Sequence, residues 1–597
     1  MVFAYRPGQE EAIRSIIRAI ESGKRTVFLH AETGSGKSII LTHVARHFAE
    51  TKGWRTYYTT PLVSLVDQIS TDNLLPPNEP VYGKSNYPCA QDTTLNAEDG
   101  WCMTGIPCAR CGQTGRISVR TLDGSHATER CPECRGQGVT VDDAYARTCP
   151  QRMAGRCEYY AARDRALSGR LGVMTMAYFN KVARPKSKME EAKPDTDRFG
   201  PRDLLIIDEA DNLAEVSAQW LSLSLSRDFV RRPEWGAWWD GEGSAILSMP
   251  SKAIERFERE ELLPWIEHAA MAVREALEGM EDDLGPGETA VHRHRKRQRV
   301  KNALSHLMAA VEDLKNGNPW VVEARDEQTM CVTVTPVAST RYLKDNLWPI
   351  STVRILASGT FLGRGARTLG VSEMGLDPRE CFLHVQPPVL PPSRAPIVPF
   401  SPGAMNYQNR ETMIPLFLSR LERILNLEPN RGIVHARSYA NMTAIREHFS
   451  NRPMGKRLVF HTSEDRNDSL DAWLRDTRND VVLVCVNFTR GLDLKDDLAR
   501  WQVSFKCPYP SLSSRRVQKR LKMPDGEEWY RLQALREELQ LCGRTMRSMD
   551  DWSNTYLLDL NSIRLFEGHI AILPSGLKDR YLIGKRNGRF TAPVSAP

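Results

Sequence analysis

A glycine-rich segment near the N-terminus has the residues and the setting of a phosphate-binding loop. It reads HAETGSGKSII over residues 30–40, between an apolar run and a helical pattern. Gly34 and Gly36 allow backbone N–H groups to close around phosphate oxygens, and the N-terminus of the following helix adds positive potential. Lys37 would reach the β- and γ-phosphates of a nucleotide, and Ser38 would ligate Mg²⁺. The first glycine of the usual pattern is an alanine here.

A pair of carboxylates is suited to complete this site. Asp208 and Glu209 directly follow four apolar residues, LLII. A buried strand of that composition would carry them to the C-terminal edge of a sheet, where α/β proteins bind ligands. Asp208 can hold Mg²⁺ through water, and Glu209 can orient or deprotonate the attacking water. In isolation the pair also fits a capped helix start, but together with the phosphate loop it predicts an NTPase.

Most of the cysteines gather in one segment. Eight of the 13 lie within residues 89–157 of a long chain. Disulfide scaffolds are short and secreted, so this cluster indicates metal binding instead. Two C-x-x-C pairs, with 19 residues between them, have the spacing of a closed tetrahedral Zn²⁺ site, the alternative being four buried or free thiols. The predicted zinc ligands are Cys108, Cys111, Cys131 and Cys134.

Alternating strand and helix signals surround these residues in both halves of the chain. That alternation predicts an α/β protein with a parallel sheet in each half. A proline-rich stretch from Val385 is a plausible linker between the halves. The predicted units are a first α/β domain (1–80, 161–216 and 319–384), a cysteine-rich metal-binding insertion (81–160), a helical insertion (217–318) and a second α/β domain (385–597).

The composition is that of an ordinary globular protein, with 41% hydrophobic and 26% charged residues. No apolar run approaches the roughly 18 residues that a membrane span needs. The first residues include acids where a signal peptide needs an apolar stretch. We therefore expect neither secretion nor membrane insertion. Lysine and arginine outnumber aspartate and glutamate by 81 to 74, which permits a polyanionic partner without requiring one.

Segments along almost the whole chain resemble, in order, the motifs of superfamily 2 helicases. Besides the phosphate loop they are YRPGQ (5–9), TTPLVSLVDQ (59–68), DEAD (208–211), LASGT (356–360), GIVHARSY (432–439), VNFTRGLDL (486–494) and QLCGRTMRSMDD (540–551). The SGT triplet and four further segments are similar to the DinG-like and XPD-like branch. Those segments are NYPC (86–89), CEYYAARDRAL (157–167), CPYPSL (507–512) and GRTMRSMDDW (543–552). That branch usually has DEAH, whereas Asp211 is the fourth residue here.

The resemblance implies an ATP- and Mg²⁺-dependent DNA helicase with two RecA-like domains, and its motifs assign the site residues. The catalytic set is Lys37, Asp208, Glu209, Gln540, Arg544 and Arg547. The ATP-binding set is Tyr5, Arg6, Gln9, Thr33, Gly34, Ser35, Gly36, Lys37, Ser38, Gly491 and Asp493, and Mg²⁺ is assigned to Ser38 and Asp208. Arg544 and Arg547 would share one helix face and reach the γ-phosphate as arginine fingers, the alternative being two surface arginines.

The resemblance also concerns the cysteines. CPECRGQG, from Cys131, looks like a repeat of the DnaJ-type zinc-binding module. The helicase branch places a [4Fe–4S] cluster at this point in the chain, and four cysteines can hold one. Spacing alone leaves a second Zn²⁺, or no metal, open for the same residues. The cysteines concerned, which bracket the zinc pairs, are Cys89, Cys102, Cys149 and Cys157.

The family further places a helical arch over the path of the DNA strand, within residues 217–318. A basic run there, from His292 to Lys301, fits a DNA-facing arch or a solvated helix face. Three nearby tryptophans fit core packing equally well; they are Trp235, Trp238 and Trp239.

The expected protein is a monomer in the cytoplasm of a bacterial or phage-infected cell, or in a nucleus. Its expected partners are single-stranded and forked DNA, or an RNA–DNA hybrid, with 5′-to-3′ movement implied by the family. The alternatives are a nucleoprotein remodeller with little unwinding and a nucleic-acid-binding ATPase clamp.

Overall fold

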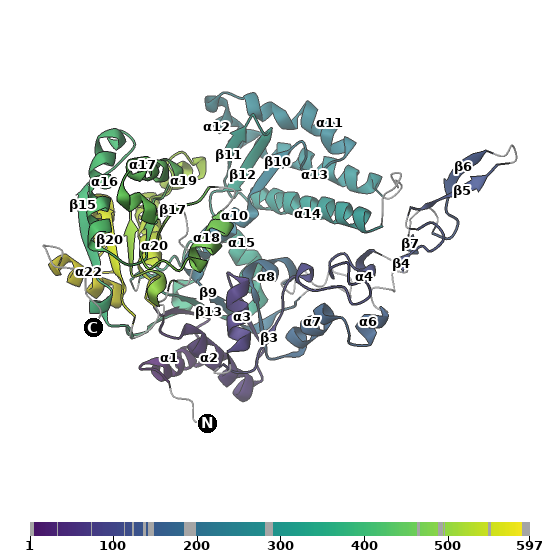
Figure 1. The fold of residues 1–597 in the computed structure, drawn as a ribbon. Coiled ribbons are helices and arrows are strands. Elements are labelled where there is room, and N and C mark those ends of the chain that lie inside the picture. The colour runs from purple at the N-terminus through teal and green to yellow at the C-terminus, as the bar shows by residue number, and fades with distance from the viewer. Residues whose placement is uncertain are drawn as a thin grey trace.

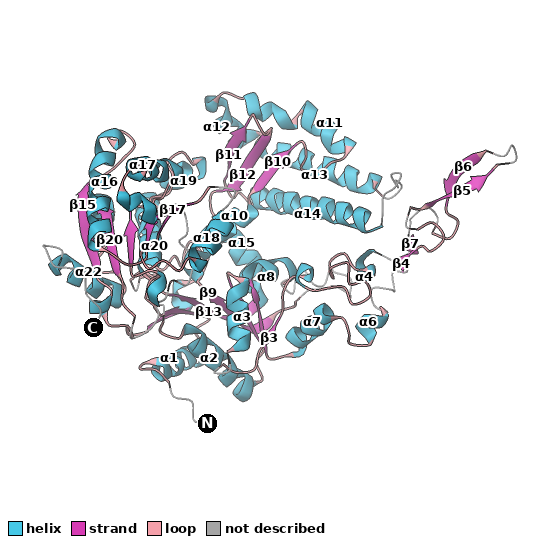
Figure 2. Cartoon of the chain, in the orientation of Figure 1, coloured by secondary structure: helices cyan, strands magenta, loops and turns pink. Residues whose placement is uncertain are grey.

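The structure is a computed structural model. It describes residues 5–32, 34–72, 75–104, 106–112, 114–121, 125–134, 139–140, 149–183, 199–280, 290–363, 365–462, 466–486, 494, 496–546 and 551–587. Two parallel sheets, each covered by helices, form the body of the molecule, and two insertions in the first half extend from it (Figures 1 and 2). The predicted α/β class with two RecA-like domains is confirmed.

The first sheet has seven parallel strands in the order β14-β1-β13-β9-β2-β8-β3. Strand bounds are β1 Thr26–His30, β2 Thr56–Thr60, β3 Glu79–Pro80, β8 Leu171–Thr175, β9 Arg202–Asp208, β13 Ser351–Ser358 and β14 Cys381–Val385. The helices beside it are α1 Gln9–Glu21, α2 Lys37–Lys52, α3 Val63–Thr71, α7 Glu158–Ser168, α8 Met176–Val182 and the short α15 Thr340–Tyr342.

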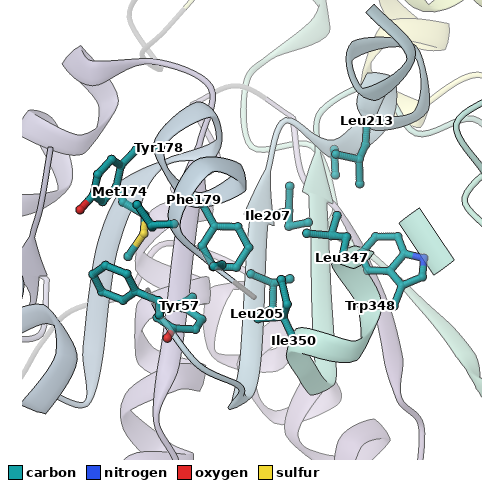
Figure 3. Packing of buried hydrophobic residues seen from close by; sticks show 14 of the residues in the cluster. Tyr57, Met174, Tyr178, Phe179, Leu205, Ile207, Leu213, Leu347, Trp348 and Ile350 are labelled. Carbon is teal, nitrogen blue, oxygen red and sulfur yellow. The ribbon is translucent and has the colours of Figure 1, made fainter. Parts of the chain in front are cut away.

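Both faces of this sheet are covered, which explains why its strands are continuous apolar runs. Along β1, Phe28 packs into one core cluster, whereas Val27 and Leu29 pack into the cluster on the other face. Figure 3 shows the first cluster, in which Phe179 of α8 lies against Tyr57 of β2. Two packed faces hold the strands in register, so the loops after them have fixed starting points.

The second sheet has six parallel strands in the order β15-β20-β19-β16-β18-β17. Strand bounds are β15 Ile397–Gly403, β16 Gly432–His435, β17 Leu458–Phe460, β18 Val482–Cys485, β19 Trp501–Ser504 and β20 Asn554–Asp559. Its helices are α16 Arg410–Leu427, α17 Tyr439–Phe449, α18 Arg466–Arg475, α19 Arg515–Leu521, α20 Gly526–Cys542, α21 Leu560–Gly568 and α22 Ser575–Asn587. The domains touch directly, since Gly363 N–H donates to Ile572 O over 2.7 Å.

The helical insertion has its own core and a small antiparallel sheet, β10-β12-β11. Its elements are α10 Leu213–Leu221, β10 Leu223–Ser226, α11 Pro233–Gly241, α12 Ser251–Glu260, α13 Leu262–Gly279, α14 Ala290–Lys315, β11 Trp320–Asp326 and β12 Cys331–Pro336. Trp235 and Trp239 are fully buried in this core, in line with the packing alternative. Residues 320–336, assigned from sequence to the first α/β domain, lie in this unit, because β11 and β12 pair with β10.

The cysteine-rich insertion consists of short elements. They are α4 Trp101–Thr104, β4 Ile106–Pro107, β5 Arg116–Arg120, β6 His126–Arg130, β7 Val139–Thr140 and α6 Pro150–Met153. The β5–β6 hairpin projects away from the body (Figure 1). Helix α14, which carries the basic run, contacts this insertion through the Arg295 guanidinium and the carboxylate of Asp99. Among the described residues, no helix is long and apolar enough to cross a membrane.

Candidate active site and metal centre

The predicted phosphate loop lies between the buried strand β1 and helix α2, which begins at Lys37. Gly34 and Gly36 have φ values of 82° and 78°, in the left-handed region that favours glycine. A Cβ at Gly36 would stand 2.2 Å from Nε2 of Gln9, so the loop also needs glycine there for space. The loop therefore presents its backbone to the N-terminus of α2, as the sequence predicts.

Residues before α1 brace this loop. Gln9 is fully buried; its Nε2 donates to Ser35 O over 2.9 Å, and its Oε1 accepts from Arg6 N over 2.8 Å. The Arg6 guanidinium donates to Gly34 O over 2.5 Å. The Tyr5 hydroxyl lies 2.7 Å from Nδ1 of His43 in α2. Three residues assigned to ATP binding thus surround the loop and the first helix after it.

The two carboxylates that the sequence predicts to be catalytic lie where β9 ends, directly beside the loop lysine. Lys37 Nζ is 2.5 Å from Glu209 Oε1 and 3.5 Å from Asp208 Oδ1. Burial alone would lower the pKa of Lys37, but the two carboxylates outweigh it and raise the pKa above its usual value. Burial raises the pKa of Asp208, and Lys37 opposes that rise. The backbone of Glu209 has φ 56°, an uncommon conformation for a residue other than glycine.

The second domain reaches these carboxylates through one amide. Gln540 Nε2, from α20, donates to Thr360 Oγ1 over 3.0 Å, and lies 3.3 Å from Glu209 Oε2 and 3.4 Å from Asp211 Oδ2. Ser358 Oγ donates to Asp211 Oδ1 over 2.9 Å. Asp211 is the residue that departs from DEAH, and its carboxylate contacts both the SGT segment and the second domain. This network connects the loop after β13 with Glu209.

A second contact between the domains was not foreseen from the sequence. Glu32, in the phosphate loop, accepts a hydrogen bond from Gly576 N–H at the start of α22, over 3.1 Å. A Cβ at Gly576 would stand 2.5 Å from the Glu32 carboxylate. Burial raises the pKa of Glu32, while Arg580 and the α22 N–H groups oppose that rise. The two residues lie 544 positions apart, so no local pattern could have paired them.

Residues of both domains line a pocket at this point that is open to solvent. Glu32, Glu209 and Thr360 line it from the first domain, and Gln540, Gly543 and Arg580 from the second. Arg544 is 8% exposed; burial, and after it the charges of Arg437 and Arg544, lower the pKa of His435. Four predicted residues lie outside the described part of the chain: Thr33, Gly491, Asp493 and Arg547.

The four predicted zinc ligands come together. Cys108 Sγ is 3.8 Å from Cys131 Sγ, Cys111 Sγ is 3.5 Å from Cys134 Sγ, and all four sulfurs lie within 4.8 Å of one another. Zn–S bonds of 2.3 Å in a tetrahedron separate the sulfurs by about 3.8 Å. All four residues are buried at the base of the β5–β6 hairpin. The group fits a single tetrahedral metal ion.

The outer cysteines are arranged differently. Cys89, Cys149 and Cys157 line a pocket of about 360 Å³, together with Trp101 and other residues. A Cβ at Gly100 would stand 2.8 Å from Cys89 Sγ, so a small residue is needed beside that sulfur. Cys102 lies in α4, next to Trp101, and its side chain lies outside the described part of the structure. Three of the four outer cysteines therefore lie around one pocket.

Comparison with known proteins agrees with this architecture. A family model described as a helicase C-terminal domain matches residues 421–564, and one described as the res subunit of type III restriction enzymes matches residues 3–88. The chain is 25% identical over 171 residues to the ATP-dependent DNA helicase CHL1 of Vanderwaltozyma polyspora. That alignment covers 24% of this chain and spans about a fifth of the relative, 21% of its length.

Solved structures of XPD proteins share the fold over nearly the whole chain. S. tokodaii Xpd4 has a TM-score of 0.53 and 15% identity, with 94% of this chain and 97% of that chain covered. An XPD helicase structure has a TM-score of 0.54 and 18% identity, with 96% and 98% covered. The chain therefore has the fold of these XPD structures, and two of its segments match the helicase C-terminal and type III restriction family models.

Proposed function

We propose that this protein is an ATP- and Mg²⁺-dependent DNA helicase that moves along single-stranded DNA and unwinds duplexes or RNA–DNA hybrids. The main support is the cleft where Lys37 and Glu209 of the first domain meet Gln540 of the second. An NTPase site shared by two domains can convert hydrolysis into relative domain movement. The family resemblance implies 5′-to-3′ direction, and the CHL1 relative is described as an ATP-dependent DNA helicase.

The contacts of Lys37 suggest how the site becomes active. Its ammonium pairs with Glu209 over 2.5 Å. ATP phosphates would replace that partner, because Lys37 lies at the N-terminus of α2 beside the glycine loop. Glu209 would then be free to accept a proton from the attacking water. Ser38 and Asp208 are the residues that would hold Mg²⁺, which would supply positive charge to orient that water and the phosphates. ATP binding would thus both place the phosphate and free the base.

Gln540 connects this chemistry to the second domain. Its amide contacts Thr360 and lies near Glu209 and Asp211, so a change at either carboxylate alters an interdomain contact. Hydrolysis and product release would therefore change the contacts between the two domains. Movement along the strand needs grip that does not depend on sequence, which backbone contacts supply.

Lys37→Ala tests the site assignment. We expect the variant to lower kcat for ATP hydrolysis by about 10²–10³-fold, because a positive charge on the transferring phosphate is lost. The measurement is ATPase activity with and without single-stranded DNA, together with strand displacement on forked DNA and on an RNA–DNA hybrid. Lys52→Ala, at the far end of the same helix, is the matched control.

The same assays separate the alternatives. Many-fold stimulation of wild-type ATPase by single strands, with strand displacement that Lys37→Ala lacks, supports the helicase. Stimulated ATPase without displacement of either substrate would instead indicate a nucleoprotein remodeller. ATPase that does not respond to nucleic acid would indicate a clamp.

We further propose Zn²⁺ at the four inner cysteines and a [4Fe–4S] cluster at the outer ones. The inner sulfurs have the separations of one tetrahedral ion, whereas Cys89, Cys149 and Cys157 surround a pocket. The zinc would fix the base of the β5–β6 hairpin. The cluster would stiffen the insertion where it contacts α14.

Metal analysis tests both assignments. Anaerobically purified protein is expected to be brown and to contain about four irons and one zinc per chain. Cys89→Ser should remove iron and colour while zinc stays, and Cys131→Ser should do the reverse. Cys331→Ser, outside both sets, serves as the control. Colourless protein with two zincs, prepared with iron supplied, would contradict the cluster.

A further inference from the structure

The β5–β6 hairpin has two chemically different faces. Its strands are antiparallel, with Arg116 opposite Arg130 and Arg120 opposite His126. Side chains alternate between the faces of a strand, so paired residues share a face. One face, named here the basic face, consists of Arg116, Ser118, Arg120, His126, Thr128 and Arg130. The other carries Ile117, Val119, Ala127 and Glu129.

The basic face is exposed and its charge is not balanced by acids. Each of its six residues is exposed to solvent. In the described part of the chain, no ion pair involves Arg116, Arg120 or Arg130, and the single acid of the two strands, Glu129, lies on the other face. Arg116 and Arg130 stand directly opposite each other, an arrangement of like charges that destabilises a strand pair. A polyanion bound across the face would remove that repulsion.

The metal-binding residues hold this face in a fixed place. Cys111 and Cys134 lie on either side of the hairpin in sequence, and Cys131 directly follows β6. Cys131 N–H donates to Gly115 O over 2.8 Å, which closes the base of the hairpin. The hairpin then extends away from both α/β domains (Figure 1). A site anchored at its base and projecting from the body can reach nucleic acid outside the cleft.

The geometry of the face suits a phosphate backbone. Arg116 and Arg120 lie four residues apart on one strand, about 14 Å at the usual rise per residue. Phosphates along one strand of duplex DNA follow at about 3.4 Å per step of the axis, so such a span covers several of them. The face has no Phe, Tyr or Trp on which bases could stack, unlike the surfaces that grip single strands.

We propose that the basic face binds the sugar–phosphate backbone of duplex DNA, independently of sequence. The proposal rests on the proposed helicase function and extends it: the cleft works on the single strand, and the hairpin holds the duplex arm of the fork. Guanidinium groups bind phosphate oxygens in pairs of hydrogen bonds, which explains arginine rather than lysine on this face.

Full-length, zinc-loaded protein tests the proposal by fluorescence anisotropy. The probes are a labelled fork with a duplex arm and the matching single strand. R116E/R120E/R130E should weaken fork binding by about tenfold or more, because several phosphate contacts are lost. The slope of log affinity against log salt should fall by about three. Affinity for the single strand, and the ATPase that it stimulates, should stay at the wild-type level.

Two further variants keep the result interpretable. Glu129→Gln, on the opposite face of the same strand, is the matched control and should bind the fork as the wild type does. If R116E/R120E/R130E loses its zinc, R120Q/H126Q takes its place, because these two residues lie at the end of the hairpin farther from the cysteines. This variant should also weaken fork binding. Unchanged fork affinity in zinc-loaded R116E/R120E/R130E would overturn the proposal, as would an equal loss for fork and single strand. Wild-type protein that does not hydrolyse ATP would refute the proposed function. Its affinity for duplex DNA is a separate measurement and would still test the basic face.

Discussion

Replacing Arg544 with alanine is expected to lower kcat for ATP hydrolysis by about 10³-fold or more. Arg544 comes two residues after the end of α20, is 8% exposed, and its charge acts on His435 at the end of β16. A guanidinium supplied by the second domain would neutralise charge that builds up on the γ-phosphoryl group in the transition state. The measurement is steady-state ATPase at saturating ATP and single-stranded DNA, with thermal unfolding recorded for each variant.

Two variants separate catalysis from folding. Arg531→Ala removes an exposed arginine of α20, paired with Glu527 over 3.1 Å, and should leave kcat near the wild-type value. Arg544→Lys keeps the charge without the planar fork of donors, so it should recover little of the lost rate. Normal turnover by a folded Arg544→Ala protein would show that the cleft does not need this residue. Arg547, to which the motif assigns the same role, would then be the remaining candidate for the arginine finger.

Glu209→Gln should stop turnover while ATP binding persists. The expected fall in kcat is about 10²–10⁴-fold, because the side chain keeps its shape but cannot accept a proton. Its carbonyl oxygen can still accept from Lys37, so the loop should keep its arrangement. The measurements are single-turnover hydrolysis and direct binding of labelled ATP to the same preparation.

A matched substitution elsewhere provides the comparison. Glu527 lies in the first turn of α20 with an 80% exposed side chain, and Glu527→Gln should change neither measurement. A near-normal kcat in Glu209→Gln would remove Glu209 from the role of base. Loss of ATP binding in that variant would point instead to a structural role for the carboxylate beside Lys37.

Local sequence patterns were sufficient to predict the sheets and the phosphate loop. Strands such as β1 and β9 are buried on both faces, so their composition is apolar throughout and easy to recognise. Gly34 and Gly36 were predictable because only glycine combines a positive φ with close approach. The four inner cysteines were predictable because C-x-x-C spacing brings two sulfurs to one metal.

Local sequence patterns do not predict which distant segments of the chain pair with each other. β11 and β12 have clear strand character, but local sequence does not say which sheet a strand joins, and they pair with β10 of the helical insertion. The boundary drawn at residue 319 therefore does not follow the sheets. Glu32 was likewise passed over, because its partner Gly576 lies at the other end of the chain. Asp211 was noted only as a departure, although it contacts Ser358 and Gln540.

The contact between Glu32 and the start of α22 has a thermodynamic consequence. The carboxylate occupies a helix N-terminus, a place that favours an anion, so this contact helps to join the two domains. If ATP binds between the domains as we propose, its binding free energy would be linked to this contact. Such coupling is reciprocal: if nucleotide binding strengthens the contact between Glu32 and α22, an intact contact strengthens nucleotide binding by the same factor. In the proposed helicase, tension on the bound strand that strained this contact would then lower the affinity for nucleotide.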